Sequence, residues 1–344
     1  MYYVACRPDI GRGERGAMSS ASSSVRSVSG AELFNLLQAQ KNWPSGGAPP
    51  CFDLRPDGAR RRIIRGSFPA RFNEGEVEVK GVSAGSWLGR AVCLYDADAE
   101  RLEDHAVAQQ LLKDGCSQLL LLSEPFEAFE KAYPFICAKE TSSKASKRSL
   151  YPSCIVPGLL YLGDLTDAAA LPRLKEQLNI RSAVTALAEL PPSLKQSVSE
   201  ARVEHTWCNV RDVEEADIKS HFAKAIERIG AAKAAGHAIF IHCSRGVSRS
   251  ASLCMAYLMK TDGMGAQQAR AFVEACRPIV LPNDGFWKCL CEYEKELSGQ
   301  RTGVYAPAPK SKGVDELYAP ARPARLARLA ARACRRLARL APVH

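Results

Sequence analysis

The segment with the clearest chemistry is IHCSRGVSRS, residues 241–250, which lies between a strongly apolar strand and an apolar helix. A strand that runs through a short loop into the start of a helix points several backbone N–H groups, and the positive end of the helix dipole, at one point. Such a loop binds an anion. Cys243 stands at its first position, where these groups and a nearby arginine favour the thiolate over the thiol. The loop is therefore predicted to hold a nucleophilic sulfur against a phosphate group.

The other loop residues have chemical roles that follow from their types. Arg249, six residues after Cys243, offers a planar fork of donors that can hold two oxygens of a phosphoryl group. Gly246 permits backbone angles that a side chain would forbid. Ser250 brings a hydroxyl close to the sulfur, and His242 is expected to orient the loop by hydrogen bonding. The residues expected to bind the substrate phosphate are Ser244, Arg245, Gly246, Val247 and Ser248.

Expulsion of an alcohol from a phosphoryl group needs a proton donor on the side opposite the nucleophile. Asp212 is the best candidate, because it follows the strand-like HTWCNV and precedes a helix predicted over 217–235. This places it on a loop at the end of a parallel sheet, where α/β sites are built. Glu214, Glu215 and Asp217 are alternatives, although Asp217 is more typical of a helix N-cap.

Apolar strand-like runs and helical segments alternate in two units of the chain. The first, residues 29–138, contains CFDLR, AVCLYD and QLLLL between helical stretches. The second, residues 151–298, contains LLYLGD, IRSAVTAL and HAIFIH, with a helix predicted over 250–260. This alternation predicts α/β domains with parallel sheets covered by helices. The polar segment 139–150 reads as a linker.

Both ends of the chain differ in composition from these units. Residues 1–28 are rich in Gly, Arg and Ser and are predicted to be a disordered leader. The GxGxxG spacing inside it is interpreted as accidental, because no apolar helix follows. Residues 299–344 are Pro-rich and then rich in Arg, Ala and Leu; the seven arginines after residue 318 account for most of the net charge of +10. We interpret this segment as a basic tail; an amphipathic helix that contacts nucleic acid or an anionic membrane is the alternative.

Composition indicates a globular protein that stays inside the cell. With 344 residues, 46% of them hydrophobic, the chain can form two domains, and no run approaches the roughly 18 apolar residues of a membrane span. An export signal is not evident, so a cytoplasmic location is expected, with the nucleus as an alternative and an organelle transit peptide ranked lower. The 13 cysteines are expected to be reduced. Most fit packing positions rather than metal sites, and Cys208 or Cys254 is a candidate partner for an oxidised Cys243.

The second unit resembles the catalytic domain of dual-specificity protein phosphatases. The resemblance rests on HC-x2-G-x2-R-S, on Asp212 upstream, and on the downstream segments 256–259 and 277–286. It implies a shallow pocket that admits phosphotyrosine and phosphoserine or phosphothreonine. It also implies that Ser250 assists hydrolysis of the phosphoenzyme and that Asn283 supports the phosphate loop by a hydrogen bond. Neither a metal nor an organic cofactor is implied.

The first unit is similar to the rhodanese-like module that precedes the catalytic domain of mitogen-activated protein kinase phosphatases. CFDLRP, AVCLYD and FEAFEKAYPFIC carry this similarity. Asp96 stands where a sulfur-transferring rhodanese has its cysteine, so a non-catalytic docking or regulatory module is expected. An arginine cluster is a candidate kinase-docking site, with a solvated loop as the alternative: Arg60, Arg61, Arg62 and Arg65.

Together these features predict a signalling hydrolase. It would dephosphorylate phosphotyrosine and phosphoserine or phosphothreonine in proteins through a cysteinyl-phosphate, with a MAP kinase-like protein as one candidate substrate. Serine/threonine/tyrosine-interacting-like proteins share the two-domain order, and a phosphoprotein-binding scaffold without turnover is the alternative function. A phosphatase for lipids or RNA ends would want more positive charge in the loop than Arg245 supplies.

Overall fold

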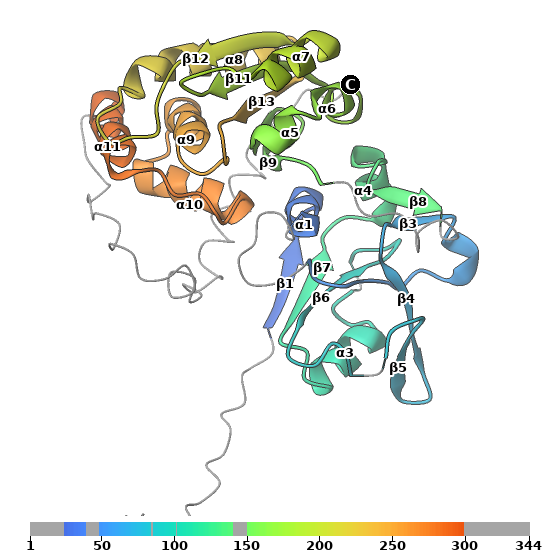
Figure 1. Ribbon diagram of the computed structural model, residues 1–344. Coiled ribbons are helices and arrows are strands. Elements are labelled where there is room, and N and C mark those ends of the chain that lie inside the picture. The colour runs from blue at the N-terminus through green and yellow to red at the C-terminus, as the bar shows by residue number, and fades with distance from the viewer. Residues whose placement is uncertain (1–23, 39–47, 84, 101, 140–149, 299–344) are drawn as a thin grey trace, which may run out of the picture.

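The computed structural model describes residues 24–38, 48–83, 85–100, 102–139 and 150–298 (Figure 1). The glycine motif of the leader, most of the predicted linker and the basic tail lie outside the described residues. Among the described helices, none has the length and apolar character needed to cross a membrane.

The N-terminal unit is built on a six-stranded sheet in the order β1-β7-β6-β2-β4-β5, in which only the β4–β5 pair is antiparallel. The strands are β1 (Ser24–Val28), β2 (Cys51–Asp53), β4 (Phe68–Asn73), β5 (Glu76–Val79), β6 (Ala91–Tyr95) and β7 (Gln118–Leu122). A separate pair is formed by β3 (Arg62–Ile64) and β8 (Cys137–Lys139). The helices are α1 (Gly30–Leu37), α3 (Ala106–Lys113) and α4 (Phe126–Ala132), with a 3₁₀ turn η1 (Asp57–Ala59).

Alternate residues of the central strands explain why both faces of this sheet carry helices. Cys93 and Tyr95 of β6 belong to one apolar cluster with α1, whereas Val92 and Leu94 belong to a second cluster with α3. Successive side chains of a strand point to opposite faces, so an unbroken apolar run such as AVCLY indicates burial on both sides. The prediction of a parallel α/β unit is confirmed.

The predicted leader is too long at its C-terminal end. Ser24–Val28 form β1, which pairs in parallel with β7 from Ser24↔Gln118 to Val28↔Leu122. A composition-based prediction misses such a strand, because the edge of a sheet supplies backbone partners whatever the side chains are. Only Val28 of this strand is buried.

The second unit contains a five-stranded sheet in the order β12-β11-β13-β10-β9. Its strands are β9 (Ser153–Val156), β10 (Leu160–Gly163), β11 (Ile180–Ala186), β12 (Glu204–Cys208) and β13 (Ala238–His242). All pairs are parallel except β9–β10. The helices are α5 (Leu165–Ala168), α6 (Leu171–Leu178), α7 (Pro192–Ala201), α8 (Phe222–Ala234), α9 (Arg249–Asp262), α10 (Ala266–Cys276) and α11 (Asp284–Ser298), with a 3₁₀ turn η3 (Lys219–His221).

The strand order places the helices on both faces of this sheet. The connections through α6 and α7 run in one direction along the sheet and that through α8 runs back, so right-handed crossovers put α8 on the opposite face. The helix predicted from residue 217 begins at Phe222, after the 3₁₀ turn η3, in which the Ser220 N–H donates a hydrogen bond to the Asp217 side chain (3.1 Å).

The two units share a continuous apolar core, and α1 lies at the junction (Figure 1). The Asn35 side chain accepts a hydrogen bond from the Cys154 N–H and donates one to the Cys154 carbonyl, both at 2.8 Å. Phe34 packs against Tyr151, with ring centroids 6.0 Å apart. Helix α1 of the first unit therefore satisfies the backbone of the edge strand β9 in the second.

Candidate active site

The loop between β13 and α9 has the anion-binding shape that its sequence predicts. Gly246 adopts φ +66°, in the left-handed region that favours glycine. A Cβ at this position would lie 2.4 Å from the carbonyl oxygen of Gly163, so a side chain has neither the backbone angle nor the space. Glycine is required here for both reasons.

Cys243 lies at the start of this loop, and its sulfur is a hydrogen-bond acceptor. Its Sγ accepts hydrogen bonds from the Gly246 N–H (3.2 Å) and the Ser250 hydroxyl (3.1 Å). Burial alone raises the pKa of the Cys243 thiol, but hydrogen bonds from Ser250, the charge of Arg249 and the Val247 N–H outweigh it and leave the pKa below the ordinary value. The site thus favours the nucleophilic thiolate.

Arg249 opens helix α9, and its guanidinium lies between the loop and Asp212. Its Nε lies 3.5 Å from an Asp212 carboxylate oxygen. Among the described residues this buried Nε has no hydrogen-bond partner. A buried, unsatisfied donor of this kind is suited to an oxygen of a bound phosphoryl group.

Asp212 is joined to the phosphate loop by three neighbours. Its Oδ1 accepts hydrogen bonds from the Ser248 hydroxyl (2.7 Å) and the Asn283 side-chain amide (3.0 Å), and its Oδ2 faces Arg249. The structure thus brings together Asp212, Arg249 and the loop that carries Cys243, although Asp212 and Cys243 are 31 residues apart in the sequence.

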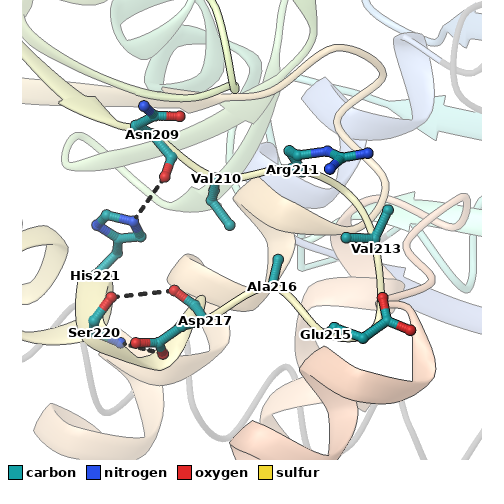
Figure 2. Close-up of a pocket in the computed structure, with 9 residues that line it drawn as sticks. All are labelled: Asn209, Val210, Arg211, Val213, Glu215, Ala216, Asp217, Ser220 and His221. Atoms are coloured by element: carbon teal, nitrogen blue, oxygen red, sulfur yellow. Dashed lines mark hydrogen bonds between the residues drawn. The ribbon is translucent and has the colours of Figure 1, made fainter.

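Two of the alternative acids, Glu215 and Asp217, line a pocket that does not include the nucleophile candidate. Glu215 and Asp217 line a shallow pocket on the loop that follows β12, together with the first residues of the next helical turn (Figure 2). Its lining does not include Cys243. The Asp217 side chain also accepts a hydrogen bond from the Ser220 N–H. Geometry therefore favours Asp212 over both.

Asn283 supports the phosphate loop as expected, but through its backbone N–H, while its side-chain amide bonds to Asp212. Its backbone N–H donates to the Ser248 hydroxyl (3.1 Å), while its side-chain amide donates to Asp212. Its Oδ1 accepts from the Phe286 N–H (2.9 Å) at the start of α11. Asn283 thus connects the phosphate loop, the loop that carries Asp212 and helix α11.

His242 lies behind the loop and orients it. Its Nε2 contacts the Thr185 hydroxyl (2.7 Å) and its Nδ1 contacts the Cys243 carbonyl (3.3 Å). Burial lowers the pKa of His242 to about 4, so the imidazole is neutral near pH 7. A neutral ring can bond on both sides without taking part in proton transfer.

Cys254 lies beneath the loop on α9, fully buried. Burial, together with the neighbouring Cys243, raises the pKa of its thiol, and burial raises the pKa of Cys208 to about 11. Both are therefore poor nucleophiles in this state, and partnership with an oxidised Cys243 stays a prediction. The eleven cysteines in the described ranges are free thiols. The same ranges hold no cluster of three His, Cys, Asp or Glu side chains that could bind a metal.

Sequence reasoning assigned no role to Arg277, although it recognised the segment that begins there. Its side chain is fully buried and bonds to two carbonyls of the phosphate loop, Gly246 O (2.8 Å) and Arg245 O (3.1 Å). The available signal was an arginine in an apolar helix end directly before Pro278. A charged side chain is almost never fully buried unless other groups pair with it.

The arginine cluster of the first unit is only partly available for docking. Arg60 is 4% exposed, pairs with Asp57 and donates to the Arg55 carbonyl. Arg62 pairs with Glu130 (2.5 Å). Arg60 therefore stabilises the module itself, and the prediction that it belongs to an exposed docking cluster or a solvated loop is wrong. The Arg62 side chain stays 42% exposed, so for the rest of the cluster kinase docking stays a prediction.

The fold and this constellation define a cysteine-dependent phosphatase with a preceding parallel-sheet module. A family model described as "Dual specificity phosphatase, catalytic domain" matches residues 160–296. The chain is 30% identical over 332 residues to dual specificity protein phosphatase 4 of Gallus gallus, which covers 83% of this chain and 86% of that protein. It is 31% identical over 271 residues to human dual specificity protein phosphatase 5, covering 69% of each chain.

The name of a third relative mentions a rhodanese domain. A probable rhodanese domain-containing dual specificity protein phosphatase of Dictyostelium discoideum is 32% identical over 193 residues, or 55% of this chain and 39% of that one. A solved structure, human DUSP28, is 29% identical and covers 44% of this chain and 99% of its own, with a TM-score of 0.39.

This chain belongs to the dual-specificity protein phosphatase family. It is a phosphoric monoester hydrolase for phosphorylated proteins that acts on phosphotyrosine and phosphoserine or phosphothreonine, and its N-terminal module is rhodanese-like.

Proposed function

We propose that the chain hydrolyses phosphoproteins in two steps through Cys243, with Asp212 as acid and then base. The observation that carries this is the shared geometry of the sulfur, the Ser250 hydroxyl, Arg249 and Asp212 around one loop. It supports a defined mechanism.

In the first step the Cys243 thiolate attacks phosphorus, the P–O bond to the substrate breaks, and the leaving oxygen takes a proton from Asp212. Arg249 and the loop N–H groups hold the non-bridging oxygens as charge redistributes. In the second step water attacks the cysteinyl-phosphate, the S–P bond breaks and Asp212 takes the water's proton. Donation by the Ser250 hydroxyl to the departing sulfur, now 3.1 Å away, stabilises the returning thiolate.

The test compares wild type with Cys243→Ser and Asp212→Asn on an aryl phosphate and on a doubly phosphorylated Thr/Tyr peptide. Cys243→Ser should abolish release of phosphate from both. Asp212→Asn keeps the size of the side chain but removes the proton, so it should slow the peptide by about 10²–10⁴-fold and the aryl phosphate, whose leaving group needs less protonation, by less. Wild type that binds the peptide under reducing conditions without releasing phosphate would establish the scaffold alternative.

We also propose that a MAP kinase-like protein is a substrate and that residues 29–138 contribute to its recognition. A relative whose name gives both a rhodanese domain and a dual specificity phosphatase supports this, as does the exposed Arg61 beside the buried Arg60. The kcat/KM for a full-length phosphorylated kinase should exceed that for its phosphopeptide. Arg61→Glu should remove part of the difference, and equal values for protein and peptide would oppose docking. A cytoplasmic location stays a prediction that imaging of the tagged chain tests.

A further inference from the structure

Arg277 is the largest of the fully buried side chains in the described part of the protein. It directly follows helix α10 and is 0% exposed. Burying a guanidinium costs several kcal/mol unless its donors are bonded and its charge is compensated. A structural reason for keeping it must therefore lie in what it contacts.

Its donors reach three separate segments. Nε donates to the Gly246 carbonyl (2.8 Å) and Nη2 to the Arg245 carbonyl (3.1 Å), both in the phosphate loop. On the opposite side Nη1 donates to the Ser153 hydroxyl of β9 (3.4 Å), and Nη2 lies 3.8 Å from the Asp164 carboxylate after β10. The fork thus ties the loop to the two strands beside it.

The two carbonyls matter because of the peptide bonds to which they belong. In a planar trans peptide the C=O and the following N–H point in opposite directions. A donor that holds the Arg245 carbonyl on one side therefore turns the Gly246 N–H to the other side, and that N–H is the one that donates to Cys243 Sγ (3.2 Å). Holding the Gly246 carbonyl turns the Val247 N–H in the same way.

We propose that Arg277 is a positioning residue of the phosphate loop, which fixes two consecutive peptide planes so that their N–H groups face the Cys243 sulfur and the phosphate. This rests on the proposed role of Cys243 and goes beyond it, because it assigns the loop's anion-binding shape to a side chain that never touches substrate. Two peptide dipoles are held together by one rigid fork, which a lysine, with a single charged tip, does not reproduce.

The test uses Arg277→Lys, which keeps the charge and loses the fork, and the matched control Arg270→Lys. Arg270 lies on helix α10, which directly precedes Arg277, but its guanidinium stacks on Trp287 rather than contacting the loop. Two readouts need no turnover: the affinity for orthovanadate, measured as protection of Cys243, and the pH dependence of Cys243 alkylation by iodoacetamide. Both address the loop directly.

Arg277→Lys should weaken vanadate binding at least tenfold, move the alkylation midpoint to higher pH and lower kcat/KM for an aryl phosphate by a similar factor, while Arg270→Lys resembles wild type. An Arg277→Lys protein that folds and keeps both the vanadate affinity and the alkylation midpoint would overturn the proposal.

If Arg277→Lys does not fold, Ser153→Ala decides the matter, since it leaves Arg277 in place but removes one anchor. The same readouts should then move in the same direction by roughly two- to fivefold, and unchanged values would overturn the proposal. Failure of the proposed catalytic function would show differently: wild type would lack turnover, while vanadate binding and alkylation would still separate the Arg277 variants.

Discussion

Replacing Ser250 with alanine tests how the site keeps Cys243 ionised. The Ser250 hydroxyl donates to the Cys243 sulfur at 3.1 Å, and both side chains are buried. A hydrogen bond to a charged group is worth about 1.5–3 kcal/mol, and each 1.4 kcal/mol changes an equilibrium about tenfold. Because the hydroxyl stabilises only the thiolate, its loss raises the pKa of Cys243. At a pH below the midpoint we expect about 10- to 100-fold less thiolate.

The assay is the rate of Cys243 alkylation by iodoacetamide between pH 4 and 9, followed by mass spectrometry. Ser252→Ala is the matched control, because Ser252 is buried on the same helix but donates to the Ser248 carbonyl (3.0 Å) rather than to the sulfur. Ser250→Ala should also prolong the phosphoenzyme, which a larger burst of nitrophenol relative to the steady rate would show. An alkylation profile of Ser250→Ala that matches the Ser252→Ala profile would refute the reasoning.

Three further perturbations follow from the same contacts. Asn35→Ala leaves the two backbone groups of β9 that it bonds at 2.8 Å without these partners, so the free energy of unfolding in urea should fall by about 2–4 kcal/mol; no change would show that α1 does not stabilise β9. Gly246→Ala should reduce vanadate affinity and stability more than Gly263→Ala, because both have positive φ (66° and 65°) but only Gly246 lacks space for a Cβ; equal losses would contradict this. His242 stays neutral in the folded state with a pKa of about 4 but has its ordinary pKa of about 6.5 when unfolded, so the unfolded chain binds more protons as pH falls and stability is lost between pH 6.5 and 4. Wild type should lose about 3 kcal/mol more than His242→Gln over this window in chemical denaturation, and parallel curves would exclude this contribution.

The catalytic loop was predictable because its chemistry is local. Cys243, Gly246 and Arg249 lie within seven consecutive residues between a buried strand and a helix, and the local geometry of that turn is enough to bring them together. Asp212 was predictable for a topological reason, since the carboxyl ends of parallel strands meet at one edge of a sheet and β12 and β13 both belong to it.

The predictions that failed involved backbone pairing or side-chain direction. Strand β1 forms because the edge of β7 offers hydrogen bonds, which composition does not report. Arg60 turns inward to Asp57 and the Arg55 carbonyl, although it stands in a run of charges typical of a surface loop. The partner of β1 is distant in the sequence, whereas the partners of Arg60 are only three and five residues away, and the folded turn decides that its side chain points toward them.

The sequence by itself determined the α/β class, the two units and the anion-binding loop that begins at Cys243, because strand and helix periodicity and a seven-residue loop are local properties of the chain. Only the tertiary structure decided what holds the loop in shape. The partners of Arg277 come from segments 31 and 124 residues away, at Gly246 and Ser153, and a buried guanidinium becomes recognisable as support for the site once those segments are packed around it.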